Sequence, residues 1–169
     1  MKSGWIKMLV ATGLVVALIL STGFNASAWS HHDQEIVGTW RVTVQLNNCS
    51  GTSIGGPFQS LLTFADGETM IEDTTNPGFA AGQRGTGHGI WEYKGHRTYD
   101  AKSVAFINFT TPAAPPSPGF TAGTQTIDQT IEFNHGPNQW SADAKVEFAD
   151  ASGTVYRQAC AAATAKRFE

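Results

Sequence analysis

Hydrophobic and polar residues alternate with a period of two along most of the chain. The alternation is clearest over residues 140–148, where Trp140, Val146 and Phe148 share one face and polar or charged residues share the other. Residues 36–46 alternate in the same way. Because successive side chains of a β-strand point to opposite faces, this pattern predicts strands with one buried side and one side facing solvent.

Short turn sequences divide the alternating runs into separate predicted strands. Asp66-Gly67 and Lys94-Gly95 are typical of hairpin connections between antiparallel strands. We expect eight strands, at residues 36–46, 58–64, 69–74, 87–93, 98–109, 121–133, 140–148 and 154–168. Two longer loops are also expected. The loop over residues 76–85 is rich in glycine. The loop over residues 111–119 contains four prolines, which cannot extend a ladder of hydrogen bonds.

Sequential antiparallel strands in an open sheet would leave two unpaired edges. Closure into a barrel pairs the first strand with the last and removes both edges. The sequence therefore predicts an all-β fold, an eight-stranded antiparallel up-and-down barrel in a single domain. A two-sheet sandwich is the alternative, but it needs crossover connections, and most of the turns are too short for them.

The N-terminal segment is typical of a secretory signal peptide. A short positive stretch with two lysines precedes an apolar run over residues 8–20, and Ala26 and Ala28 form a small-residue cleavage site. The apolar run is shorter than the roughly 20 residues that span a membrane. We therefore expect a signal peptide over residues 1–28 and a secreted or periplasmic barrel domain over residues 29–169, without membrane association after cleavage.

Size and charge narrow the classes of partner. The 169-residue chain carries a formal net charge of −3, and removal of the two lysines in the signal lowers this charge to −5. The remaining length is typical of one domain. An acidic chain without a basic run is not expected to bind nucleic acid or an anionic membrane surface.

The chain contains two cysteines, Cys49 and Cys160. Cys49 follows the first predicted strand and Cys160 lies within the last, and these two strands are neighbours in a closed barrel. In an exported protein an even pair of cysteines indicates one disulfide. We expect it to join the barrel at its seam and to close a loop of about 100 residues, for which the chain-entropy model gives up to about 4.7 kcal/mol.

A short motif at the start of the first strand suggests a family. Gly38-Thr39-Trp40 resembles the Gly-x-Trp signature of lipocalins and other calycins. The resemblance implies a barrel whose narrow end is closed by Trp40, with an arginine of the last strand packed across it; Arg167 is the expected partner and Arg157 the second choice. The sequence has no Thr-Asp-Tyr element, so it is more similar to a calycin-like branch of secreted bacterial barrels than to the true lipocalins.

The same tripeptide lies at the start of avidin-type barrels. Trp91 and Trp140 resemble the ligand-facing tryptophans of those barrels. The resemblance to calycins implies a binding protein for a small, largely apolar molecule that needs no cofactor and performs no catalysis. The interior residues expected to contact such a ligand are Trp40, Trp91, Phe106, Gln129 and Trp140. Gln129 is of special interest, because a buried amide between apolar neighbours needs a partner and could orient a ligand.

Small side chains decide whether the predicted interior holds space. The last strand carries alanine at every second position from Ala159 to Ala165, and Ala142 and Ala144 are also small. If these residues point inward, they leave room for a ligand. The alternative is a filled barrel in which they accommodate bulky neighbours at ordinary packing density, and which serves as an interaction module.

An enzyme is the other alternative. His88 lies in a glycine-rich stretch, Glu92 shares its face, and Arg97 and Asp100 follow shortly after. Such residues could build an acid–base pair at the barrel mouth, for an isomerase or a hydrolase. No nucleophile motif or zinc-binding motif accompanies them.

The mature N-terminus could bind a metal ion. Cleavage after Ala28 would leave a free amine on Trp29 and place His31 third in the chain. The terminal amine, two backbone amides and the imidazole then form a square of nitrogens, which suits Cu(II) or Ni(II). An ordinary terminus with two histidines is the competing interpretation.

Overall fold

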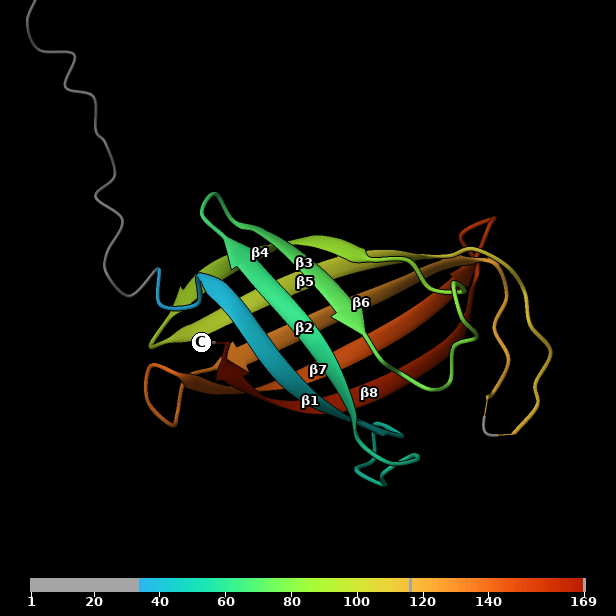
Figure 1. Cartoon of the computed structure of the whole chain (residues 1–169), viewed down its shortest axis with the longest axis horizontal. Coiled ribbons are helices and arrows are strands. Elements are labelled where there is room, and N and C mark those ends of the chain that lie inside the picture. Colours follow the sequence, from blue (N-terminus) through green and yellow to red (C-terminus); the bar gives the residue numbers. More distant parts are fainter. Residues whose placement is uncertain (1–33, 116, 169) are drawn as a thin grey trace, which may run out of the picture.

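The computed structural model describes residues 34–115 and 117–168, which form one closed barrel (Figure 1). Every strand pairs antiparallel with its neighbours in sequence, and the first strand pairs with the last. The strands are β1 (Gly38–Asn47), β2 (Phe58–Ala65), β3 (Thr69–Thr74), β4 (Gly87–Gly95), β5 (Thr98–Ile107), β6 (Gly123–Glu132), β7 (Gln139–Asp150) and β8 (Val155–Arg167). The predicted fold and strand order are confirmed, with differences of a few residues at strand ends.

The seam between β1 and β8 is a regular antiparallel ladder that runs from Trp40 opposite Arg167 to Asn47 opposite Cys160. The predicted disulfide between Cys49 and Cys160 lies at the far end of this ladder, with 4.8 Å between the two Cα atoms. Cys49 itself has a φ of 51°, in a turn just beyond β1. The disulfide therefore joins β8 to the loop that leaves β1.

The end of the barrel at which β1 begins and β8 ends lies on the left in Figure 1. Aromatic side chains fill this end. The ring of Trp40 lies 5.4 Å from that of Phe133 and 5.9 Å from that of Trp140, measured between centroids. The guanidinium of Arg167 lies 4.3 Å from the centre of the Trp40 ring and donates hydrogen bonds to the carbonyls of Glu35 and Val37. Arg167 is therefore the arginine that covers Trp40, as the resemblance to calycins implied.

The surroundings of Gly38 explain why a glycine lies two positions before Trp40. Its φ is 131°, and a Cβ atom there would lie 2.7 Å from a guanidinium nitrogen of Arg167. A larger residue would be strained in its backbone and would displace the arginine from Trp40. The Gly-x-Trp motif and the arginine of the last strand thus form one packing unit.

Arg157, the second candidate, has a different role at the opposite end. Its guanidinium lies 5.0 Å from the centre of the Phe120 ring and 5.9 Å from that of Phe148. It also donates hydrogen bonds to the carbonyls of Pro118 and Gly119. Arg157 thereby holds the loop between β5 and β6 against β8.

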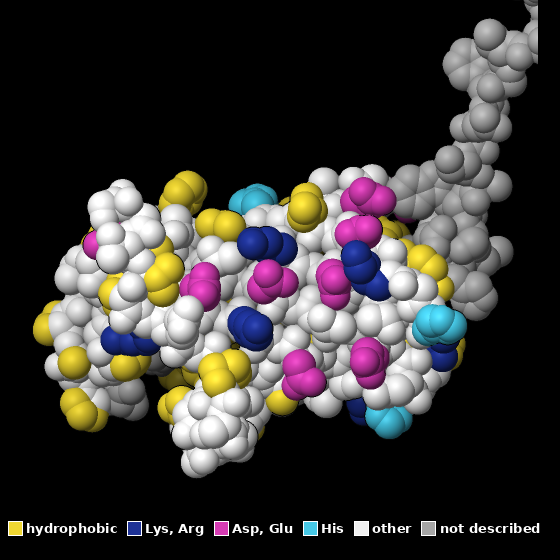
Figure 2. Space-filling model, turned by 180° about the vertical axis from the view of Figure 1, so that it is seen from behind, with side chains coloured by type: hydrophobic (Ala, Val, Ile, Leu, Met, Phe, Trp, Pro, Cys, Tyr) yellow, Lys and Arg dark blue, Asp and Glu magenta, His cyan; other side chains and the backbone are white. Residues whose placement is uncertain are grey.

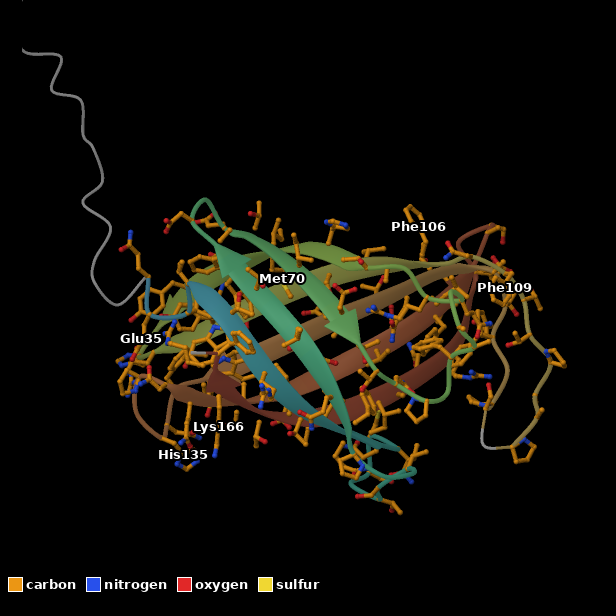
Figure 3. The ribbon with its side chains drawn as sticks, viewed as in Figure 1. Glu35, Met70, Phe106, Phe109, His135 and Lys166 are labelled. Carbon is orange, nitrogen blue, oxygen red and sulfur yellow. A yellow bond between two sulfur atoms is a disulfide. The ribbon has the colours of Figure 1, made fainter. Side chains whose placement is uncertain are left out.

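The expected place of Phe106 in the interior is wrong. Its side chain is 69% exposed and projects from the outer side of the barrel (Figure 3). In β5 the inward positions are those of Tyr99, Ser103 and Ile107, because Tyr99 pairs with the inward Ile131 of β6. Phe106 lies an odd number of residues from these positions, so its side chain points to the outer face.

The outer face of the barrel carries charges of both signs. Basic and acidic side chains are interspersed over the face seen in Figure 2. Pairs such as Lys102 with Asp128 and Lys94 with Glu92 lie 3.8 Å and 3.3 Å apart between nitrogen and oxygen. Among the described residues there is no helix long and apolar enough to cross a membrane.

Candidate ligand cavity

A cavity lies inside the barrel, between the aromatic end and the loops at the opposite end. The centre of a water molecule can reach about 60 Å³ of it, and one water needs roughly 10–15 Å³ by this measure. The interior of the barrel is therefore incompletely filled.

One part of the cavity wall is apolar and built from small or branched residues. β1 contributes Val44 and Leu46, and β8 contributes Ala161 and Ala163. Ala144 of β7 lies directly opposite Ala161 in the ladder between β7 and β8. Because both partners of that pair are alanine, neither side chain reaches far into the barrel, and space remains between the sheet and the opposite wall.

Another part of the wall is polar and comes from β2, β3 and β6. It contains Ser60, Glu72, Gln125 and Gln129, each of which is at least nine-tenths buried. Each occupies an inward position of its strand. Few polar groups in a mainly apolar cavity are typical of sites that orient a small molecule.

Glu72 carries a charge inside the barrel and is paired with Arg84. A guanidinium nitrogen of Arg84 lies 2.9 Å from Glu72 Oε2, and only 7% of the Glu72 side chain and 4% of the Arg84 side chain are exposed. Ser103 Oγ donates a further hydrogen bond to Glu72 Oε2, and Arg84 Nε donates to the side-chain oxygen of Gln125. Burial of both ions is tolerable because they neutralise each other and are hydrogen-bonded.

Gly87 leaves room for this ion pair. A Cβ atom at Gly87 would lie 2.9 Å from Glu72 Oε2 and 3.4 Å from a guanidinium nitrogen of Arg84. Gly89 has another role, because a Cβ atom there would lie 2.0 Å from the backbone oxygen of Lys102 in β5. The glycine-rich stretch is thus explained by the close approach of a buried ion pair and of a neighbouring backbone.

Two polar side chains of the wall, those of Gln129 and Ser60, form no hydrogen bond with any side chain or backbone group of residues 34–115 and 117–168. Both residues line the cavity and are 7% and 5% exposed, respectively. Their hydrogen-bonding groups therefore face the cavity, where water or a ligand can reach them.

The loop between β3 and β4 contributes Asn76 and Phe79 to the lining of the cavity. Phe79 of this loop lines the cavity and packs on Phe120, with 4.5 Å between ring centroids. The fully buried Gln83 holds the loop, since its amide nitrogen donates to the Phe109 carbonyl and to Thr111 Oγ1. The same loop thus positions both Phe79 in the cavity wall and the buried Arg84.

Of the five residues expected to contact a ligand, Gln129 alone lines this cavity. Trp40, Trp91 and Trp140 are buried, but they belong to the aromatic cluster that fills the other end. The Trp91 indole donates a hydrogen bond to the backbone oxygen of Ala65. Ligand contact by these tryptophans stays a prediction, and Phe106 faces outward.

Sequence reasoning missed Glu72, Arg84, Ser60 and Gln125. A signal existed for three of them, because each lies two residues from an apolar residue of the same strand and therefore on the same face. These neighbours are Leu62 for Ser60, Met70 for Glu72 and Ile127 for Gln125. No such signal existed for Arg84, which lies outside any strand.

The residues of the enzyme hypothesis do not meet at the barrel mouth. His88 and Glu92 are both exposed, on the outer face of β4. Arg97 instead forms a double hydrogen bond with Glu35, at 2.9 Å and 2.6 Å, and this pairing raises the pKa of the arginine above its usual value. Asp100 accepts a hydrogen bond from Thr130 on the outside of the barrel.

The proposed metal site at Trp29 and His31 lies outside the described residues. Within the described part of the chain, no group of three or more His, Cys, Asp or Glu side chains is arranged to hold a metal ion. Copper or nickel binding at the terminus stays a prediction.

The chain matches no protein-family model, and no curated protein sequence matches it. Its closed eight-stranded barrel, with Arg167 packed over Trp40, is consistent with a calycin-like fold. This agreement is one of fold and not of function.

Proposed function

We propose that the protein is an extracytoplasmic, calycin-like binding protein that holds a small, mainly apolar molecule in its barrel. The observation that carries the proposal is the internal cavity, walled by valine, leucine and alanine side chains and by a few buried polar groups. Burial of apolar surface would supply most of the affinity, at roughly 25 cal/mol per Å². The limited space favours a compact ligand with a single ring or short chain.

The proposed location outside the cytoplasm is supported by the disulfide between Cys49 and Cys160. Such bonds persist in oxidising compartments and are rare in the cytosol. The signal-like sequence of residues 1–28 points the same way. We propose a secreted or periplasmic protein that would meet its ligand outside the cytoplasm.

The proposal is tested first by native mass spectrometry of protein purified from its own host. A ligand that stays bound would add a discrete mass to the intact protein, which is lost on denaturation. The same measurement on the Ala161→Phe variant is expected to show loss of this added mass, because Ala161 lines the cavity and a phenyl group would occupy it.

Ala162→Phe is the matched control. Ala162 is the next residue of β8 and is exposed on the outer face, so the same substitution leaves the cavity unchanged. We expect this variant to retain the ligand. Retention of the ligand by a folded Ala161→Phe protein would place its binding site elsewhere and contradict the proposal.

A further inference from the structure

We infer that the cavity selects electrically neutral molecules that carry a hydroxyl or a similar group able both to donate and to accept a hydrogen bond. This inference rests on the proposed function and defines the ligand more narrowly. It is carried by the polar wall, which we define as Ser60, Glu72, Gln125 and Gln129.

The first step concerns charge. Among the described residues that line the cavity, Glu72 is the one acidic residue, and Arg84, 2.9 Å away, neutralises it inside the barrel. The other members of the polar wall are uncharged amides and a hydroxyl. A carboxylate or ammonium group on a ligand would therefore lose its hydration without gaining a free counter-charge, and transfer of such an ion into a poorly solvated site is unfavourable.

The second step concerns hydrogen bonds. Within the described chain the Gln129 side chain and the Ser60 hydroxyl have no hydrogen-bond partner, and the Gln125 side chain receives a hydrogen bond from Arg84 but donates none. The free groups include amide N–H donors as well as carbonyl and hydroxyl acceptors. A purely hydrocarbon ligand would displace water from them and leave them unsatisfied, whereas a hydroxyl can satisfy a donor and an acceptor together.

The third step concerns the shape of the ligand. The wall contributed by Val44, Ala144 and Ala161 offers no polar side chain. The chemistry of the site is thus two-sided, and it fits a compact amphiphile whose hydrocarbon body contacts the alanines and whose hydroxyl contacts the polar wall.

Four probes of similar size test this inference. Benzyl alcohol, ethylbenzene, benzylammonium and benzoate are titrated separately into the purified protein at pH 7, and binding is followed by protein NMR. We expect benzyl alcohol to bind at least about tenfold more tightly than either charged probe. Equal or tighter binding of benzoate or benzylammonium would overturn the inference.

A substitution separates polar recognition from general hydrophobic binding. Gln129→Leu is expected to weaken benzyl alcohol about tenfold, in line with loss of a hydrogen bond in a buried site, and to leave ethylbenzene binding unchanged or stronger. Gln139→Leu makes the same change at an exposed position on β7 and is expected to alter neither. An equal change in affinity for both probes in Gln129→Leu would show that the Gln129 amide does not form a hydrogen bond with the hydroxyl of the ligand.

Gln129→Glu provides a second readout that does not depend on lost affinity. It adds a negative charge to a wall that is otherwise balanced, so benzylammonium should gain affinity relative to benzyl alcohol. An unchanged ratio would contradict the charge argument. If both neutral probes bind the wild-type protein and Gln129→Leu affects them alike, the selectivity fails while the proposed function stands; if no probe binds, both fail.

Discussion

The two halves of the barrel follow the same alternation but differ in what fills them. At the aromatic end, Ala165 of β8 lies opposite Trp140 of β7, so a small side chain meets a large one. Two and four residues further along the ladder, Ala163 lies opposite Ala142 and Ala161 opposite Ala144. Both alanines of the first pair belong to the cluster that fills the aromatic end, whereas both alanines of the second pair line the cavity. We call the part of the barrel around the cavity the hollow half; small residues alone do not make a cavity, because bulky neighbours can fill the space that they leave.

The halves also differ in how they treat polar groups. At the aromatic end, Arg167 and Arg97 are exposed enough to meet water and are bound to backbone carbonyls or to Glu35. In the hollow half, Glu72 and Arg84 are buried as an ion pair, and the Gln129 side chain, which faces the cavity, forms no hydrogen bond within the described residues. The aromatic end also holds an unpaired polar atom among the described residues, Trp140 Nε1, but this atom is fully buried. The first arrangement stabilises the closure of the barrel, and the second leaves polar groups available to a ligand.

The largest expected effect compares two phenylalanines that point inward from β2. Phe64 is fully buried against Trp140 at the aromatic end, whereas Phe58 is half-buried and lines the cavity. We expect Phe64→Ala to lower the free energy of unfolding by about 3–5 kcal/mol and Phe58→Ala by less than half of that, because Phe58 already borders empty space. Urea unfolding of both variants measures the difference, and equal losses would mean that the hollow half is as tightly packed as the filled one.

The disulfide is expected to have the next largest effect, and it acts on the hollow half. It spans 111 residues and joins β8 to the loop after β1. Its removal by Cys49→Ala together with Cys160→Ala should lower the stability by about 2–4 kcal/mol. Thermal unfolding gives the loss, and hydrogen exchange should rise near Asn47 and Cys160 more than near Trp40. Uniform exchange along the seam would contradict this local role, and two free thiols in the native protein would exclude the bond.

The smallest effect concerns Asp150, at the turn that closes β7 to β8. Hydrogen bonds from the Ser152 hydroxyl and the Thr154 backbone amide lower the pKa of this carboxyl below its ordinary 3.8. A carboxylate with a lowered pKa stabilises the folded state above pH 3.8, and this contribution is lost as the pH falls through the lowered value. An NMR titration of Asp150 should show the low pKa in the wild type and a return toward 3.8 in Ser152→Ala. A pKa at or above 3.8 in the wild type would contradict the turn geometry.

Alternation predicted the phase of most strands correctly but not that of β5. In β6 and β7 the charged residues from Asp128 to Glu147 lie on the outer face, and the predicted inward residues Ile131, Trp140 and Val146 are buried. In β5 the inward positions between Tyr99 and Ile107 are alanine and serine, while Val104 and Phe106 point outward. Residue hydrophobicity therefore assigned the wrong face of β5 to the interior of the barrel. The inward face is set by the pairing of Tyr99 with the buried Ile131 of β6.

The candidate site was predictable in part. Gln129 was identified because it alternates with isoleucines within one strand, and the alanines of β8 indicated space for the same reason. The pairing of Glu72 with Arg84 was not predictable, since Arg84 belongs to a loop and reaches the interior only when that loop is held by Gln83.

By itself, the sequence determined the strands, their sequential order, the closure of the barrel and the disulfide. These follow from local periodicity, turn residues and the need to pair strand edges, all of which act between near neighbours or on the whole sheet. The tertiary structure alone decided where the barrel is filled and where it is hollow. That outcome depends on register, which sets Ala144 opposite Ala161, and on long-range convergence, which brings Glu72, Arg84 and Gln125 together from separate elements.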